Sequence, residues 1–278
     1  MLSRGANVQG RKDLTECPPD LDYFQGKEGR KRFFKAYQKL GVSSHSWVKT
    51  RVSTPNHIVD EYLKGVIQRN RVPMPAVLHQ TSLRALDLVG MGVADDYMCA
   101  LGEVLSMMPY LETINVRNNR LTDKGVHAIL APAYNLRNLK VLDLSENEIG
   151  ERSSAKLLEL LTSPGCRLDS LVLEKADVDD HECRHIMQAL EINSSLSSLF
   201  LSNNLIGQAE SLNVVQPDLI TGGEATSTML RTNYSLQTLD LSWNSIRGDS
   251  AVDIARALAD NTTLKTLSLS HNAFGDRG

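Results

Sequence analysis

The 278-residue chain has little of what several classes of protein require. Its four cysteines lie far apart and form no CxxC pair, so the sequence predicts free thiols and no disulfide framework. No apolar run approaches the roughly 18 residues of a membrane span, and the first residues, MLSRGANVQGRKDLTECPPD, lack the apolar core of a signal peptide. These absences favour a protein of the cytoplasm or nucleus without a membrane span.

The motifs of catalysis are also missing. No glycine-rich phosphate loop is present, and GQAES is not the GxSxG turn that presents a serine nucleophile. The segment HECRH, from His181 to His185, matches the HExxH zinc pattern, but the repeat frame described below places both histidines at outward positions, and no third ligand is evident. We therefore expect a non-enzymatic protein with no cofactor, no metal and no small-molecule substrate.

Acidic residues are scarce in the first 80 residues and abundant afterwards. The first part contains 14 Lys and Arg against 7 Asp and Glu, a net charge of +7, and the rest contains 16 against 26, a net charge of −10. Within the basic part, KEGRKRFFKAYQKLG at 27–41 predicts an amphipathic helix. We expect this helix either to dock on the rest of the protein or to bind an acidic partner, a nucleic acid or an anionic membrane.

What the sequence does contain is one phrase, LxxLxLxxNxL, in seven versions. The LxL core alternates with period two, as a strand does, and the following half spaces its apolar residues three and four apart, as an amphipathic helix does. Each unit therefore predicts one strand and one helix, with the strands parallel. The opening leucines are 28 or 29 residues apart except for one interval of 40. They are Leu83, Leu111, Leu139, Leu168, Leu196, Leu236 and Leu264.

This phrase resembles the leucine-rich repeat family, and its period resembles that of the ribonuclease-inhibitor-like class. The resemblance covers roughly Leu83 to Gly278, about 70% of the chain. It implies an α/β fold, a leucine-rich repeat solenoid or horseshoe with a parallel β-sheet on the concave face and helices on the convex face. The wording LDLSWN is also similar to that of some cytoplasmic and ciliary members, which adds the cilium to the expected locations.

Asparagine recurs at two positions of the repeat. At the ninth position of the phrase its side chain can both donate and accept, so we expect it to satisfy backbone groups where the strand turns. Met91 and Ala176 replace it, which predicts an atypical first repeat and a weakened turn in the fourth. Asn193, Asn233 and Asn261 begin N-x-[ST] sequences three residues before an opening leucine, so we expect structural asparagines and no glycosylation there.

The sequence divides into three regions. Residues 1–52 predict a basic, partly disordered region that contains the amphipathic helix, 53–82 a helix that caps the first repeat, and 83–278 about seven repeats. The interval of 40 predicts an insertion of about 12 residues within 207–230, where Pro217, Gly222 and Gly223 indicate a loop. The last repeat lacks its helix, which predicts a fragment of a longer protein or a pairing partner at that edge.

The repeat frame assigns three columns of residues to the concave face. The residue between the two inner leucines gives Asp87, Asn115, Asp143, Val172, Phe200, Asp240 and Ser268. Two places further on stand Val89, Arg117, Ser145, Glu174, Ser202, Ser242 and Ser270, and one more place gives Gly90, Asn118, Glu146, Lys175, Asn203, Trp243 and His271. Because parallel strands lie about 4.8 Å apart, the aromatic members of the last three repeats fall within about 10 Å along the stack.

Aromatic side chains surrounded by polar ones are typical of binding hot spots, and the alternative is that the rings only cover neighbouring apolar surface. The predicted function is to bind a protein partner on the concave face. The candidate contact residues are Phe200, Trp243, His271 and Asn203, with Asp240, Asp143, Glu174, Lys175 and Arg117 for charge selectivity. The alternative function is the regulation of a small GTPase, in the manner of the Ran GTPase-activating proteins, which share this repeat class.

Overall fold

The computed structural model describes residues 57–71, 74, 77, 84–208 and 220–276. All of them belong to one compact unit, Thr54–Gly278. The amphipathic helix predicted at 27–41 lies outside the described residues. Among the described residues, no helix combines the length and the apolar character that crossing a bilayer demands.

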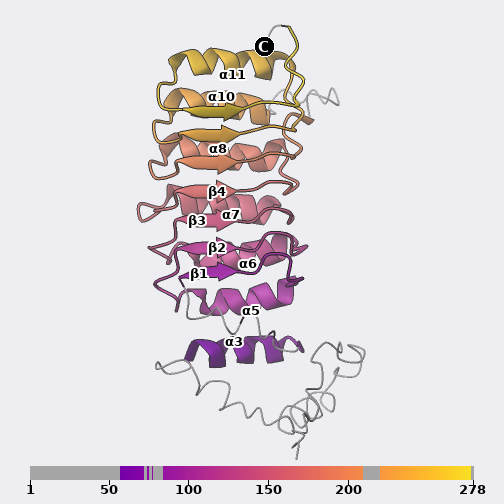
Figure 1. Cartoon of the computed structure of the whole chain (residues 1–278), viewed down its shortest axis with the longest axis vertical. Coiled ribbons are helices and arrows are strands. Elements are labelled where there is room, and N and C mark those ends of the chain that lie inside the picture. The colour runs from indigo at the N-terminus through magenta and orange to yellow at the C-terminus, as the bar shows by residue number, and fades with distance from the viewer. Residues whose placement is uncertain (1–56, 72–73, 75–76, 78–83, 209–219, 277–278) are drawn as a thin grey trace, which may run out of the picture. The chain divides into compact units, whose positions relative to one another are not determined.

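Seven parallel strands form one sheet, and their order in the sheet is their order in the chain (Figure 1). The register pairs equivalent positions of successive repeats, so that Ile114 aligns with Leu142 and Leu142 with Leu171. Every repeat thus adds one strand to the same sheet, as the phrase predicts. The strands are β1 Ala85–Asp87, β2 Thr113–Asn115, β3 Val141–Asp143, β4 Ser170–Val172, β5 Ser198–Phe200, β6 Thr238–Asp240 and β7 Thr266–Ser268.

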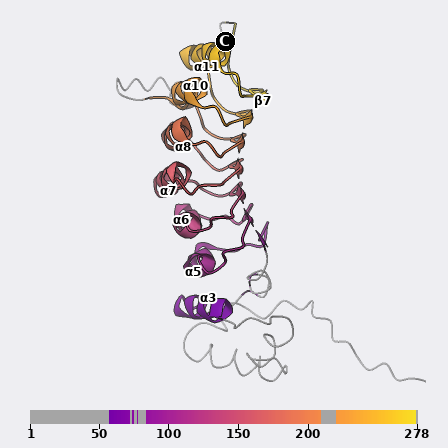
Figure 2. The same ribbon diagram turned by 90° about the vertical axis from the view of Figure 1, so that its left-hand side faces the viewer.

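The helices pack side by side on one face of this sheet (Figure 2). A helix follows each strand from β1 to β6, and its amphipathic face is buried in one core with the strand leucines and against the neighbouring helices. These helices are α5 Asp95–Leu105, α6 Asp123–Ala133, α7 Glu151–Thr162, α8 Asp180–Ile192, α10 Gly222–Thr232 and α11 Gly248–Asp260. The arrangement confirms an α/β repeat solenoid.

The leucines of the phrase form a continuous core between the sheet and the helices. In β3, Leu142 is fully buried, as is Leu144 two residues later, whereas Asp143 between them faces the opposite side and is half-buried. Each leucine buried in this way contributes about 1.5–3 kcal/mol relative to an exposed one. No single repeat covers its own leucines, so the stack is stabilised by its neighbours.

The ninth-position asparagines form a ladder that closes the turn after each strand. Asn147 Nδ2 donates to the carbonyls of Val116 and Leu144, both at 3.0 Å. Its Oδ1 accepts from the N–H groups of Asn119, at 3.2 Å, and Leu121, at 3.0 Å. The equivalent amides donate to main-chain carbonyls in the same way at Asn119, Asn204, Asn244 and Asn272. The structural role expected from the sequence is confirmed.

The fourth repeat breaks this ladder. Ala176 is buried where the asparagine would stand, and the N–H of Ile149 donates to the Ala176 carbonyl at 2.9 Å. A backbone carbonyl thus replaces a side-chain oxygen as acceptor, but the two amide donations are lost. The weakened turn stays a prediction.

The N-x-[ST] asparagines form a second ladder at the other ends of the strands. Asn193 Nδ2 donates to the Leu161 carbonyl at 2.7 Å, and Asn233 Nδ2 donates to the Leu190 carbonyl at 2.6 Å. Asn261 repeats the contact one unit later, with Leu230 at 2.7 Å. Because the amide nitrogens are used inside the fold, the structural interpretation of these sequences is confirmed.

In the fifth repeat, the residues on either side of the extra segment bind one buried carboxylate. Asp180 Oδ1 accepts from Gly207 N at 2.8 Å and from Gly222 N at 2.7 Å. The equivalent residue of the second repeat is Asp123, whose Oδ1 accepts from Gly150 N and Ser153 N of the third repeat, only three residues apart. The insertion therefore lies between the two glycines that Asp180 binds, and the repeat resumes in register after it.

This position corrects one expectation. Gly222 and Gly223 are the first residues of α10 and do not lie in a loop. They are glycines because the packing is close: a Cβ on Gly222 would lie 2.6 Å from Cγ2 of Ile206, and one on Gly223 would lie 2.5 Å from Cβ of Ser250. The glycine pair that suggested a loop in the sequence is therefore explained by close packing inside the structure.

The first repeat is covered by α3, His57–Gln68, which packs against α5. Tyr62 and Val66 of this helix are fully buried, and burial raises the pKa of the Tyr62 hydroxyl. After the helix, Arg69 pairs with Glu103 at 2.6 Å and Arg71 pairs with Asp96 at 2.8 Å. The structure thus contains the capping helix that the apolar stripe predicts, with its N-cap residues outside the described range.

Candidate functional site

The three predicted columns lie together on the side of the sheet that faces away from the helices. We call this surface the strand face. Register places Phe200 directly between Val172 and Asp240, and Asp240 beside Ser268. The first column therefore lies on the strands as the phrase predicts, and the second and third columns stand in the turns that directly follow the strands.

The third column has an unusual backbone. All seven of its members have a positive φ, between 49° and 63°. This left-handed conformation suits Gly90, Asn118 and Asn203, because glycine lacks a Cβ and asparagine tolerates the region. For a bulky side chain it costs free energy, roughly 1–2 kcal/mol. Trp243 and His271, with φ of 56° and 57°, therefore occupy positions where glycine or asparagine would have a lower conformational free energy.

Trp243 and His271 stack on each other. Their ring centroids are 3.7 Å apart and their planes meet at 16°. Trp243 nevertheless remains 55% exposed, and His271 is exposed as well. The pair forms a flat aromatic platform outside the core, held above the turns that follow β6 and β7.

Phe200 is separate from this platform. It lies half-buried on β5, and the ring pairs in contact within the described residues are Trp243–His271 and His181–His185. Asn203 is exposed beside the platform, because its N–H donates to the Ser242 carbonyl next to Trp243 at 2.9 Å. The expected aromatic cluster is thus a two-ring stack with Phe200 on the neighbouring strand.

The aspartates of the first column share a local turn. Asp240 Oδ1 accepts from Ser242 N at 2.9 Å, and Asp143 Oδ1 accepts from Ser145 N at 3.0 Å. Each bond shapes the chain that leaves the strand, in the manner of an Asx turn. One oxygen of each carboxylate is therefore structural, and the negative charge stays at the strand face.

Arg117 lies between two carboxylates. Its guanidinium contacts Glu146 at 2.8 Å and Glu174 at 3.0 Å, which joins three consecutive repeats. The hydrogen bond to Glu146 is the main reason why the pKa of Arg117 is raised. The sequence named Arg117 and Glu174 as candidates but not their mutual pairing, and Glu146 entered only as a member of the third column. Lys175 is exposed beside them.

A hollow of about 320 Å³ opens where these repeats turn from strand to helix, on what we call the turn edge. Its charged lining residues are Arg120, Glu146, Glu148, Lys175 and Asp177. All except Glu148 have a positive φ. Sequence reasoning missed this hollow, although charged residues at positions that elsewhere hold glycine were its signal.

The residues of the HExxH segment are engaged within the fold. Glu182 forms a capping box with Asp179 at the start of α8, and it is buried there. Burial and the neighbouring Asp179 raise the pKa of Glu182 to about 7. His185 binds Ser154 Oγ through Nδ1 at 3.0 Å. Within the described residues, no group of three His, Cys, Asp or Glu side chains is placed to hold a metal ion.

Comparisons with known proteins match the repeat region. A family model described as Leucine Rich repeat matches residues 108–130, 135–152, 232–255 and 260–278. Ribonuclease inhibitor of Sus scrofa is 29% identical over 203 residues, which cover 73% of this chain and 42% of that protein.

Two longer proteins are also similar. NACHT, LRR and PYD domains-containing protein 5 of Mus musculus is 30% identical over 70% of this chain and 16% of its own length. Rho GTPase-activating protein gacW of Dictyostelium discoideum is 24% identical over 76% of this chain and 19% of its own length. The chain spans less than half the length of each of these three relatives.

Proposed function

Because the chain is a leucine-rich repeat protein of the ribonuclease-inhibitor-like class, whose members act in protein–protein interaction, we propose that it is a non-enzymatic protein that binds a protein partner on its strand face. The observation that carries the proposal is Trp243. It is exposed, it lies outside the core, and its backbone conformation disfavours a large side chain. A fold alone gives no reason for a tryptophan at this position.

The platform supplies the anchor of the proposed site. Trp243 and His271 offer a rigid aromatic surface, and the exposed amide of Asn203 lies beside it as both a donor and an acceptor. Phe200 extends the contact onto the preceding strand. Aromatic anchors with polar neighbours are the residues that contribute most to protein–protein affinity.

Charge indicates the partner's surface. The three columns contain five carboxylates, Asp87, Asp143, Glu146, Glu174 and Asp240. Their basic residues are Arg117, which is occupied by Glu146 and Glu174, and Lys175. The strand face is therefore net acidic, and a partner with a basic surface fits it best. Since one relative is a ribonuclease inhibitor, a ribonuclease is the first protein to test.

The test is quantitative affinity purification with the full chain. The double variant Phe200→Ala, Trp243→Ala is compared with the wild type and with Tyr234→Ala, which removes an exposed aromatic residue away from the strand face. We expect the double variant to lose partners that Tyr234→Ala keeps, and the lost partners to bind more weakly as salt rises. Equal recovery of every partner by all three proteins, with all three folded, would show that the strand face is not the binding site.

A second candidate function is regulation of a small GTPase. It is favoured by the similarity to the Rho GTPase-activating protein, although only 19% of that protein is covered. GTP hydrolysis by Ran and by a Rho-type GTPase, measured with and without the chain, separates the two functions. An unchanged rate at saturating chain removes this candidate and leaves the binding function standing.

A further inference from the structure

We propose that the repeat unit carries a second docking surface, on the edge opposite the turn edge, that takes an acidic, apolar segment of a protein partner. This surface does not depend on the proposed function of the strand face. Its core residues are Met107, Tyr110, Tyr134, Arg137 and Arg167, and we call it the helix-end patch because these residues lie where helices end and lead into strands.

The exposed apolar side chains point to this edge. The described residues include ten large apolar side chains that are exposed, and they fall on the two edges of the solenoid. On the turn edge they are Met91, Leu205 and Ile220, with Val89 and Trp243 where the strand face borders this edge, and on the helix-end edge they are Met107, Tyr110, Tyr134, Ile192 and Tyr234. Apolar exposure that gathers in two places is more than the scatter expected of an ordinary surface.

The fold does not require tyrosines at these positions. Tyr110 is 72% exposed and stands directly before an opening leucine. The same position holds polar residues in the following repeats, Asn138, Arg167, Ser195, Ser235 and Thr263. Tyr134, 60% exposed, stands at the end of α6, whereas the later helices α8, α10 and α11 end at asparagines. Tyrosine presents a large, stiff contact surface and is enriched in protein interfaces.

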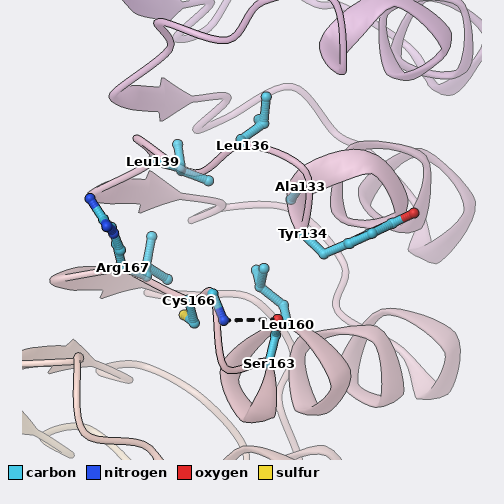
Figure 3. A pocket seen from close by; sticks show the side chains of 10 residues that line it. Ala133, Tyr134, Leu136, Leu139, Leu160, Ser163, Cys166 and Arg167 are labelled. Atoms are coloured by element: carbon cyan, nitrogen blue, oxygen red, sulfur yellow. Dashed lines mark hydrogen bonds between the residues drawn. The ribbon is translucent and has the colours of Figure 1, made fainter.

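The second asparagine ladder starts only at Asn193, and a glycine precedes it beside the patch. Gly165 stands where Asn193, Asn233 and Asn261 stand in later repeats, and without a side chain it leaves a small hollow of about 10 Å³. That volume holds roughly one water. Figure 3 shows Tyr134 and Arg167 on opposite sides of this hollow, whose floor is formed by leucines. A partner's side chain would lie across this apolar floor.

Arg167 lines the hollow, and Arg137 directly follows Leu136, which also lines it. Glu112 pairs with Arg84 at 2.8 Å and with Lys140 at 3.2 Å, so its charge is already matched. The ion pairs among the described residues include neither Arg137 nor Arg167, and both side chains belong to exposed residues. Exposed aromatic rings beside these guanidinium groups favour a segment in which apolar side chains stand next to carboxylates. The strand face, being acidic, favours the opposite kind of partner.

Two surfaces of opposite charge preference on separate faces allow two partners to be bound at once. The chain would then join an acidic segment at the helix-end patch to a basic surface at the strand face. An anionic membrane is the competing occupant for a basic, aromatic patch, and the experiment includes it.

The probe is a fluorescein-labelled synthetic peptide of about twelve residues that alternates Glu or Asp with Leu or Phe, and its binding to the full chain is measured by fluorescence anisotropy. The paired variants are Tyr110→Ser with Tyr134→Ser, and Arg137→Glu with Arg167→Glu. All four residues are exposed, so the substitutions leave the core intact, and circular dichroism checks the fold. The matched control is Trp243→Ala, which alters the other exposed aromatic site.

We expect the acidic peptide to bind the wild type, each paired variant to bind at least about tenfold more weakly, and Trp243→Ala to bind within about twofold of the wild type. A peptide with Lys in place of Glu and Asp should not bind to the patch. Equal binding by the wild type and the paired variants overturns the proposal. So does binding that is lost in Trp243→Ala, absence of peptide binding at millimolar concentration, or binding to phosphatidylserine vesicles in place of the peptide.

Discussion

Replacing Trp243 with asparagine tests whether the exposed ring contributes to the stability of the fold. The position has a φ of 56°, and Asn118 and Asn203 hold the same conformation in earlier repeats of the column. Trp243→Asn therefore keeps the turn while it removes the ring. The adjacent Asn244, which belongs to the buried ladder, is left unchanged.

The size of the effect follows from three contributions. Relief of the left-handed strain gains up to about 1–2 kcal/mol. Loss of the stack with His271 costs about 0.5–1.5 kcal/mol. Because the ring is already 55% exposed, the burial that is lost is worth only about 1–2 kcal/mol. At the middle of their ranges the two losses exceed the gain, so we expect Trp243→Asn to lower the unfolding free energy by about 1 kcal/mol.

The assay is urea unfolding followed by circular dichroism, with Leu241→Ala as the comparison. Leu241 is fully buried two residues before Trp243, and its truncation is expected to cost about 2–5 kcal/mol. A loss above about 2 kcal/mol for Trp243→Asn would refute the reasoning, because it would show that the ring supports the fold.

Three further changes test other parts of the structure. Asp180→Ala removes the acceptor of two buried backbone N–H groups and should lower the unfolding free energy in urea by about 2–5 kcal/mol, whereas Asp180→Asn, which keeps the oxygen, should cost less. Gly165→Ala should raise the unfolding free energy by about 0.4–1 kcal/mol, because its φ is not positive and a Cβ there meets nothing closer than 3.9 Å. The pKa of Glu182, raised by burial and by Asp179 to about 7, means that the fold favours the protonated carboxyl, so the contribution of Glu182 to wild-type stability should fall as pH rises from 5 to 8. Glu182→Gln should lack this fall, so the urea midpoint of the variant should rise relative to that of the wild type between pH 5 and 8. A difference between the two midpoints that stays constant with pH would contradict the raised pKa of Glu182.

The repeated phrase is sufficient to predict most of the fold. Leucine at the fourth and sixth positions fixes which side of the strand is buried, because side chains alternate along a strand. The asparagine at the ninth position fixes the turn, and its replacement by Ala176 marks where the ladder breaks. Periodic features such as these are predictable because the same pattern of residues recurs in seven repeats.

The site is less predictable because it consists of departures from that pattern. The phrase gave the column of Trp243, but not the left-handed backbone that makes the tryptophan costly there. Gly90 and Asn203 in the same column were a signal for that conformation. The bridge from Arg117 to Glu146 and Glu174 depends on the reach of long side chains across neighbouring strands, which sequence spacing does not specify.

The glycines at the start of α10 show a further limit. In a sequence, Gly222 beside Gly223 indicates a flexible loop, since glycine is common in turns. In the structure both are glycines because neighbouring side chains leave no room for a Cβ. Composition cannot distinguish conformational freedom from crowding, and only the packed neighbours of the next repeat decide between them.

The carboxylate of Asp180 also has a consequence for how this protein can be altered. Two nitrogens that bond to the same oxygen cannot lie farther apart than the two bond lengths together, so the chain leaves the repeat at Gly207 and re-enters at Gly222 through neighbouring points. Any segment whose ends can meet that closely is a candidate for exchange at this junction, whatever its sequence. A fluorescent reporter or a foreign epitope can thus be grafted there while the leucine core on both sides keeps its register.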